Sequence, residues 1–574
     1  MRHALSALFA IINHIRVPLP TLGLAFALMP SLSVAQDATD LMLINGKVIT
    51  VDDRFTIAQA LAIKGQRIVA VGSGTEIERL KGPQTRVIDL AGRTVIPGLI
   101  DNHAHWVRAA EHEEVRFDGV TSRARALALV AERVVRTSPG EWIAVLGGWS
   151  EEQFTDNQLR FTRAELDAVA PNNPVALQSI YDHTILNTAA MKSVNLDAAT
   201  ADPPGGKIER DANGQPSGLV TGGGGVAFVA AKIPLKDFES WLANTRQLVT
   251  TLNSLGITAW LDAGGRGISE KHYEPYRTLA AKGELNIRAF YTFFRMPGTP
   301  AQLDAAIAEI KQLVPFQGND YFDNVGYGEV GYLPLFTQLL RPATVPRPED
   351  LAEFKRLVIA LAERGLYFNS HVEMESVIDA MLDVYDDVNK THPIKGLRWS
   401  FAHLDQVTEA QLARMKRLGM IAQLHSRPLI QGALMHEVHG EKAWDMPPFR
   451  RVQDSGIRWG LGSDATAVTP SNPFYTLSFA VTGEMIGGRK VNRQNVSREE
   501  ALIAHTRNNA AFLFQENNIG CLTPGKYADL LVLDRDYLTV PESEIKDIKP
   551  LLTMVGGKIV YETDRGKSPD GRSQ

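Results

Sequence analysis

The sequence predicts an α/β protein: a (β/α)8 barrel of the TIM type with a small β-sandwich domain built from both chain ends. Three observations predict this fold. Eight short apolar runs alternate with polar or helical stretches through the middle of the chain. Short strand patterns with glycine turns occur instead near both ends. The chain has 574 residues, 44% of them apolar, which is enough for a large core with appended elements.

The two ends of the chain have the same β-rich character. "LMLINGKVITVD" (residues 41–52) alternates as a strand does, and Asn45-Gly46 within it predicts a hairpin. "ADLLVLD" and "LLTMVGGKIVYE" near the other end are similar. We therefore expect residues 36–96 and 516–565 to form one β-sandwich, with the barrel inserted between them so that its own ends lie close together.

The barrel is expected over residues 97–515. Segments 350–364 and 409–418 are amphipathic helix candidates lying between strand candidates, as a parallel barrel requires. The eight strand candidates are "TVIPGLIDNHAH", "ITAWLDA", "NIRAFYTFF", "NVGYGEVGY", "LYFNSHV", "RWSFAHL", "IAQLHS" and "RWGLGSD".

Between the first and second strand candidates lie about 140 residues more than one connecting helix needs. We interpret residues 107–256 as an insertion subdomain over the barrel mouth. Its four consecutive glycines, Gly222 to Gly225, are not followed by Lys-Ser/Thr. A flexible loop is therefore expected there rather than a phosphate-binding loop.

The first 35 residues resemble a cleaved secretory signal peptide. Arg2, His3 and Arg16 flank apolar stretches, and Ser33 and Ala35 supply the small residues that cleavage requires. An uncleaved anchor is the alternative, but the apolar run between Pro20 and Pro30 is too short to span a bilayer well. The sequence thus predicts an exported protein, periplasmic or secreted, without a membrane segment after cleavage. Its last residues, 566–574, are expected to be a disordered tail.

Charge and cysteine content limit the partners. A formal net charge of −5 provides no basic surface for nucleic acid, so no nucleic-acid partner is expected. A small-molecule substrate is expected instead from the motifs described below. A homo-oligomer stays open. The single cysteine, Cys521, excludes an intramolecular disulfide.

Several strand candidates end in a side chain that can bind a metal ion. His103 and His105 are two residues apart on a strand and therefore face the same side. Any one of these residues could be a buried polar group in the core, but packing explains the whole set poorly because buried imidazoles and carboxylates need partners. Neutral imidazoles with carboxylates suit zinc or a similar divalent cation. The candidate ligands are His103, His105, Glu329, His371, His403 and Asp464.

These motifs carry a family resemblance. "VIPGLIDNHAHW", "SHVEME", "FAHLDQ" and "GLGSDA" resemble the metal motifs of the amidohydrolase superfamily, and "LTPGKYADLLVLD" resembles its β-sandwich strands. "VLGGWSEEQF" and "YDHTILNTAAM" resemble the amidohydrolase 3, or YtcJ-like, subfamily. The resemblance implies a metal-dependent barrel in which His103, His105, His371, His403 and Asp464 are ligands or metal-adjacent groups.

The sequence departs from many such proteins on the fourth strand, where a carboxylated lysine often bridges two metals. "NVGYGEVGY" has no lysine, and Glu329 falls at about that place. A glutamate supplies a bridging carboxylate directly. The alternative is a glutamate that hydrogen-bonds a ligand without touching a metal. One or two ions per chain are therefore both open, with zinc as the expected metal.

The chemistry follows from these groups. A bound divalent ion lowers the pKa of water from 15.7 to about 7, and Asp464 is placed to take the proton and pass it to a leaving nitrogen. His183 is a second catalytic candidate that would polarise a substrate carbonyl, or else a core histidine. Trp149 and Arg427 are substrate-binding candidates, with core packing and a structural salt bridge as their respective alternatives. His425, at the same strand end as Arg427, could also face the substrate.

The sequence therefore predicts an exported metal-dependent hydrolase acting on a C–N bond in an amide, formamide, carbamate or cyclic amide. Two other functions are weighed against it. The same site could cleave an ester or isomerise a substrate, because the motifs bind metal and activate water without naming the bond. A non-catalytic binding or regulatory protein on the barrel scaffold is the more distant alternative.

Overall fold

The structure is a computed structural model that describes residues 39–341 and 345–563. The predicted signal peptide and the predicted tail lie outside these residues. Within the described part of the chain, no helix has both the length and the apolar character needed to cross a membrane.

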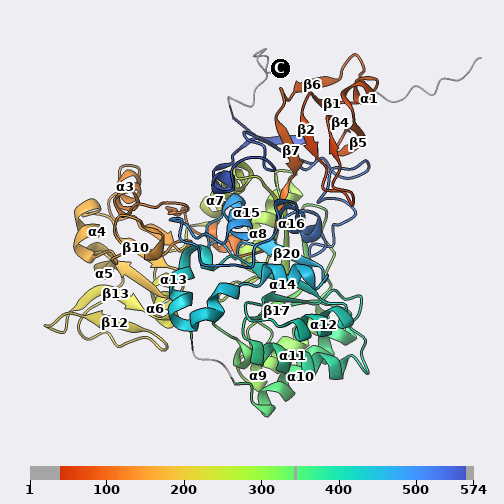
Figure 1. Cartoon of the computed structure of the whole chain (residues 1–574). Helices are drawn as coiled ribbons and strands as arrows, with labels where there is room; N and C mark the ends of the chain where they lie inside the picture. The colour runs from red at the N-terminus through yellow and green to blue at the C-terminus, as the bar shows by residue number, and fades with distance from the viewer. Residues whose placement is uncertain (1–38, 342–344, 564–574) are drawn as a thin grey trace, which may run out of the picture. The chain divides into compact units, whose positions relative to one another are not determined.

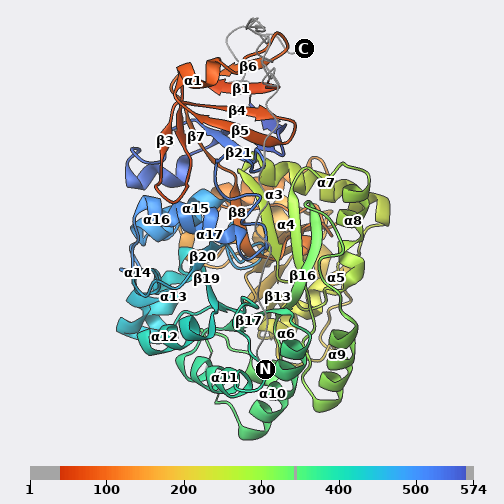
Figure 2. The ribbon, with the colours of Figure 1, turned by 90° about the vertical axis from the view of Figure 1, so that its right-hand side faces the viewer.

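The centre of the protein is a parallel eight-stranded sheet in which all eight strand candidates of the sequence appear, as predicted. Its first and last strands are joined at their carboxyl ends, where Asp464 N donates to His103 O at 2.9 Å. The sheet therefore closes into a barrel (Figure 2). In spatial order its strands are β20 (Trp459–Gly462), β19 (Ile421–His425), β18 (Ser400–His403), β17 (Tyr367–Val372), β16 (Phe322–Glu329), β15 (Arg288–Phe293), β14 (Ile257–Asp262) and β8 (Leu99–Ala104).

Helices connect the barrel strands and bury apolar side chains. On α10 (Pro348–Glu363), Phe354, Leu357 and Leu361 recur at helical spacing and are buried. The α12 helix (Glu409–Leu418) is preceded by a capping box formed by Thr408 and Gln411 and is followed by Gly419, whose φ of 74° suits glycine. Both predicted helices are confirmed. The helices that follow β8 and the later barrel strands include α2 (Trp106–Ala109), α7 (Phe238–Ser254), α8 (Glu274–Ala281), α9 (Pro300–Gln312), α10 (Pro348–Glu363), α11 (Glu375–Val388), α12 (Glu409–Leu418), α13 (Pro428–His439), α14 (Phe449–Asp454), α15 (Pro473–Thr482), α16 (Arg498–Ala504) and α17 (Arg507–Ala510).

A β-sandwich is built from both ends of the described chain (Figure 1). Apolar side chains of its two sheets, such as Leu43, Ile63, Leu530 and Met554, pack into one core. One sheet has the order β5 (Arg67–Gly72), β4 (Ala60–Lys64), β1 (Leu41–Ile44) and β6 (Arg86–Asp89). The other has the order β23 (Lys558–Glu562), β22 (Pro550–Val555), β21 (Leu530–Leu533), β7 (Thr94–Pro97), β2 (Lys47–Ile49) and β3 (Ile57–Ala58).

The predicted hairpin at Asn45-Gly46 is wrong. The strands on either side of it belong to different sheets: β1 pairs with β4 and β6, whereas β2 pairs with β3 and β7. Asn45 has a φ of 57°, the left-handed conformation that a tight turn requires. The same turn chemistry therefore carries the chain from one layer of the sandwich to the other.

The insertion between β8 and β14 is an α/β subdomain. It contains a five-stranded mixed sheet in the order β12 (Lys207–Arg210), β13 (Pro216–Thr221), β11 (His183–Leu186), β10 (Val175–Ser179) and β9 (Ile143–Leu146). Its helices are α3 (Arg123–Val134), α4 (Arg163–Val169), α5 (Thr188–Ser193) and α6 (Gly223–Ala230). In Figure 1 these elements lie together, in orange and yellow.

The four consecutive glycines are not the flexible loop that the sequence suggested. Gly222 precedes the first turn of α6, and Gly223 to Gly225 form that turn. A Cβ on Gly224 would lie 1.9 Å from Pro204 O, and one on Gly225 would lie 2.8 Å from Val220 Cγ1. The glycines therefore allow this helix to approach the neighbouring backbone closely.

Candidate metal centre

The structure brings the six predicted metal ligands together at the carboxyl-terminal end of the barrel. They come from β8, β16, β17, β18 and the residues directly after β8 and β20. All six side chains are buried. In a parallel barrel, strand ends converge on one rim, which explains how residues separated by hundreds of positions meet.

Three overlapping groups in this cluster have ligand atoms within 4.8 Å of one another. They are His103, His105 and Asp464; Glu329, His371 and His403; and His103, His403 and His425. Because His103 and His403 each belong to two groups, the three groups form one continuous centre.

Glu329 lies at the middle of the centre. Its Oε1 is 2.7 Å from His371 Nδ1 and 3.4 Å from His403 Nε2, while its Oε2 is 3.4 Å from His103 Nε2. Burial alone would raise the pKa of Glu329, but the field of His103 and hydrogen bonds from the imidazoles hold that pKa well below its usual range. The carboxylate is therefore ionised.

Backbone carbonyls orient two of the imidazoles. His105 Nδ1 lies 2.6 Å from Gly264 O, and His371 Nε2 lies 2.9 Å from Thr337 O. A carbonyl only accepts, so each of these nitrogens is the one that carries hydrogen. The opposite nitrogens, His105 Nε2 and His371 Nδ1, face the carboxylates of Asp464 and Glu329 and are the atoms that would bind a metal ion in place of these hydrogen bonds.

Asp464 faces His105 from the last strand end. Its Oδ1 is 3.0 Å from His105 Nε2. Burial would raise the pKa of Asp464, but the hydrogen bond with His105 and the neighbouring imidazoles lower it. Asp101 braces the same corner, since its Oδ1 accepts from the backbone N–H of both His103 and Ser463 at 3.1 Å. Burial raises the pKa of Asp101 to about 6.

His425 was not predicted as a ligand, yet it belongs to the centre. Its Nδ1 lies 2.8 Å from His403 Nδ1, and its Nε2 is buried without a hydrogen-bond partner among the described residues. Burial and the adjacent imidazoles hold the pKa of His425 well below its usual range, so the ring is neutral. Its position at the end of a barrel strand was the signal that could have placed it with the other histidines.

The donor set fits a divalent cation. Both ring nitrogens of His103 are buried and lack a hydrogen-bond partner within the described part of the chain. Buried polar atoms without a hydrogen-bond partner destabilise the folded state unless a ligand binds them. Imidazole nitrogens with two carboxylates are the ligands that zinc and similar borderline cations prefer.

His183 lies in the insertion, at the start of β11, between two carboxylates. Its Nδ1 is 2.9 Å from Asp182 Oδ2 and its Nε2 is 3.0 Å from Glu151 Oε1. Burial would lower the pKa of His183, but these hydrogen bonds raise it to about 9. His183 belongs to none of the three groups of ligand atoms found among the described residues, so it is not part of the metal centre.

Trp149 is packed in a core and Arg427 forms an ion pair within the protein, which are the alternatives to substrate binding that the sequence left open for them. The Trp149 side chain is fully buried and packs edge-on against Phe117 and Phe161, inside the core of the insertion. Arg427 Nη2 lies 3.1 Å from Glu373 Oε1. Glu373 is itself fully buried, so Arg427 balances a charge of the protein's own.

Tyr181 is a residue that sequence reasoning missed. It precedes the Asp182-His183 pair in the insertion, and Arg108 Nη1 donates to its hydroxyl at 3.4 Å. Arg108 lies on α2, which begins directly after His105, so this contact ties the Tyr181 hydroxyl to the same end of the barrel. The insertion therefore places a phenol beside the metal centre.

Comparison with known proteins agrees with this geometry. The model of the "Amidohydrolase family" matches residues 86–561. This range includes the whole barrel and all six candidate metal ligands. The protein belongs to the amidohydrolase family. It is therefore a metal-dependent hydrolase of the class that cleaves carbon–nitrogen bonds, and the family resemblance of its motifs is confirmed.

Several relatives match nearly the full chain. The amidohydrolase is 28% identical over 91% of its length to the N-substituted formamide deformylase of Arthrobacter pascens, of which it covers 98%. It is 24% identical over 86% of its length to the protein YtcJ of Bacillus subtilis (strain 168), of which it covers 94%. Among solved structures, an uncharacterised metal-dependent hydrolase from Pyrococcus horikoshii OT3 has the same fold, with a TM-score of 0.64, 21% identity, and coverage of 88% of this chain and 99% of that one.

Proposed function

We propose that this amidohydrolase releases formate, or a related small acyl group, from an N-substituted amide by hydrolysis of the C–N bond. The observation that carries the proposal is the converging set of buried imidazoles around two ionised carboxylates. The formamide deformylase relative, which aligns along nearly its whole length, supports the choice of bond.

We propose zinc as the cofactor, held by His103, His105, His371 and His403 together with Glu329 and Asp464. A divalent ion at such a site lowers the pKa of water to about 7 and polarises a carbonyl oxygen. Glu329 is central enough to touch two ions, because its two oxygens face different imidazoles: Oε1 faces His371, and Oε2 faces His103. Glu329 would therefore be the residue able to bridge two ions if the centre holds two.

Asp464 is the proposed proton carrier. Its ionised carboxylate accepts the proton of the attacking water and returns it to the leaving nitrogen. His105 holds that carboxylate through the 3.0 Å contact between Nε2 and Oδ1. Tyr181 lies at the same edge of the centre and would orient the substrate from the insertion, whereas His183 would only hold the loop that carries Tyr181.

The test is a turnover screen with full-length protein loaded with zinc. Matched N-formyl, N-acetyl and N-carbamoyl amines and the corresponding formate esters are compared by release of amine, alcohol and acid. Preferential cleavage of the N-formyl amines supports the proposal. Cleavage of esters alone, or isomerisation without hydrolysis, would replace it with the corresponding alternative activity.

We also propose that the protein is exported, because its first 35 residues combine basic flanks, an apolar run and small residues before Gln36. Fractionation of the producing cells, with amino-terminal sequencing of the mature protein, tests this. A mature chain beginning at or near Gln36 outside the cytoplasm is expected. An intact Met1 in the cytoplasmic fraction contradicts export.

A further inference from the structure

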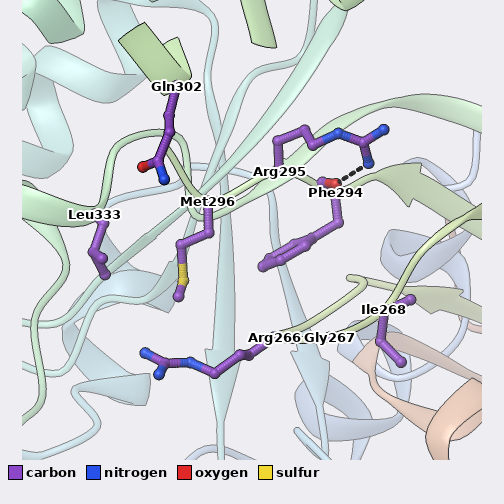
Figure 3. A pocket seen from close by; sticks show the side chains of 8 residues that line it. All are labelled: Arg266, Gly267, Ile268, Phe294, Arg295, Met296, Gln302 and Leu333. Atoms are coloured by element: carbon purple, nitrogen blue, oxygen red, sulfur yellow. Dashed lines mark hydrogen bonds between the residues drawn. The ribbon is translucent and has the colours of Figure 1, made fainter. Parts of the chain in front are cut away.

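A cavity of about 400 Å³ opens at the same end of the barrel as the metal centre. Its walls are the segments that follow β14, β15 and β16 together with the first turn of α9, and Figure 3 shows their side chains around one space. Ile268, Phe294, Met296 and Leu333 make much of the wall apolar. The volume is within the range of small-molecule sites, and such a lining suits an aryl or alkyl group.

The cavity adjoins the metal centre through two glycines. Gly264 O accepts from His105 Nδ1, and a Cβ on Gly264 would lie 2.4 Å from Phe294 Cβ. A Cβ on Gly265 would lie 3.6 Å from His105 Nδ1 and 3.8 Å from Ile268 Cγ1. The atom nearest to that Cβ is Arg108 Nη2, at 3.2 Å, so the backbone of the two glycines and the Arg108 guanidinium separate the cavity wall from His105.

Two arginines line the cavity, but they differ in their partners. The Arg295 guanidinium is held by Glu309, with Nε to Oε2 at 2.6 Å, and also donates to Phe294 O at 2.8 Å. In Figure 3 that guanidinium lies against the Phe294 backbone. The Arg266 side chain has no hydrogen bond or ion pair with another described residue, and only its backbone oxygen is bound, by Arg108.

The remaining polar group at the rim is a donor too. Gln302 accepts from Gly298 N through its Oε1 at 2.8 Å, which leaves its amide N–H groups available. Among the described residues that line the cavity, none is acidic. An unbalanced guanidinium next to amide donors and above an apolar wall is complementary to an anion carried on an apolar group.

We propose that this cavity is the subsite for the substrate's N-substituent, and that it selects an apolar substituent carrying a carboxylate, which pairs with Arg266. This deepens the proposed function and rests on it for the identity of the scissile bond. The apolar part of the substituent packs against Phe294, Met296 and Leu333, while the reacting amide reaches the metal centre past Gly264 and Gly265.

The kinetic test compares N-formyl-L-phenylalanine with N-formyl-2-phenylethylamine, which lacks only the carboxylate. Full-length zinc-loaded protein is expected to have a lower KM for the acid. Arg266→Ala should raise the KM for the acid about tenfold with little change in kcat, and leave the KM for the neutral compound unchanged. Arg295→Ala is the matched control, since the Arg295 charge is already balanced by Glu309, and it should preserve the preference. Equal KM values for the two compounds in the wild type, or an unchanged preference in Arg266→Ala, overturn the proposal.

A binding test separates this inference from the proposed reaction. Calorimetric titration of the same proteins uses 4-phenylbutyrate and 4-phenyl-1-butanol, neither of which has an amide to cleave. Tighter binding of the acid that is lost in Arg266→Ala supports the subsite even if no formamide is hydrolysed, in which case only the proposed function fails. Equal binding of the acid by wild type and Arg266→Ala places the carboxylate elsewhere, for example on the metal, and overturns the subsite.

Discussion

Both terminal nitrogens of Arg116 donate to the backbone oxygen of Thr466, each at 3.1 Å. Arg116 belongs to the insertion, whereas Thr466 follows the proposed proton carrier Asp464 by two residues. Two further contacts join the same segments: Gly148 N donates to Ala467 O at 2.8 Å, and Ser471 N donates to Asp118 Oδ2 at 2.7 Å. The insertion thus braces the loop that carries the Asp464 carboxylate.

We expect Arg116→Gln to lower kcat about tenfold while leaving the bound metal in place, because a small displacement of a catalytic group is costly. Arg116→Lys should recover part of the loss. The measurements are kcat, KM and metal content. Arg125→Gln, which removes an exposed ion pair with Glu132 on the same subdomain, is the control and should be silent. If kcat falls only in proportion to the loss of folded protein, Arg116 stabilises the fold and does not position the Asp464 loop.

The Asp464→Asn variant should retain most of its metal but have a kcat lower by about 10²- to 10⁴-fold, because the amide cannot carry the proton. The neighbouring imidazoles still hold the cation in this variant. Elemental analysis and steady-state kinetics on the same preparation check both parts. Near-normal kcat would remove Asp464 from the proton-carrying role.

Glu329→Gln should weaken metal binding by at least about tenfold, since a neutral amide replaces the ionised carboxylate at the middle of the centre. If Glu329 bridges two ions, the zinc stoichiometry of the variant falls from two to one or below. Dialysis against a chelator should abolish wild-type activity, and added zinc should restore it. An unchanged stoichiometry and affinity in Glu329→Gln would assign Glu329 to hydrogen bonding alone.

Arg427 and Glu373 form a buried pair, so removing one partner should cost more than removing both. Arg427→Met leaves the fully buried Glu373 carboxylate unbalanced, and we expect a destabilisation of about 3–5 kcal/mol. The double variant Arg427→Met with Glu373→Gln should regain much of that loss. Denaturant unfolding of the four proteins gives the coupling energy. If the two substitutions change the free energy of unfolding additively, and Arg427→Met raises the KM for anionic substrates only, Arg427 binds substrate instead of balancing Glu373.

The ion pairs of His183 should make stability depend on pH. The pKa of His183 is raised to about 9 in the folded protein, whereas it is about 6.5 in the unfolded chain. The stabilisation is therefore complete below pH 6.5 and is lost as the pH rises through 9. Because Asp182 is largely exposed, we expect only about 1–2 kcal/mol. Thermal unfolding at pH 6 and pH 9.5, compared with His183→Gln, measures the difference. Equal pH dependence in the two proteins contradicts the charged pair.

Much of the fold follows from local patterns. Each barrel strand is a short apolar run whose length and flanking turns are visible in the sequence, and the polar residue at its end is visible with it. Parallel strands place their carboxyl ends on one rim, so the meeting of His103, His371, His403 and Asp464 could be inferred without coordinates. Turn residues were less informative, because Asn45-Gly46 specifies a backbone shape and not the strands that it joins.

The sequence by itself determined the barrel, the β-rich ends and the six residues that converge at the rim, since these depend on periodicity and on the ends of strands. Only the tertiary structure decided what each polar group faces. It placed His425 in the metal centre, Trp149 in the core of the insertion and Arg427 beside Glu373. It also distinguished Arg266 from Arg295, two lining arginines that differ in whether a carboxylate lies within reach. Such pairings join residues far apart in the chain, and no local pattern encodes them.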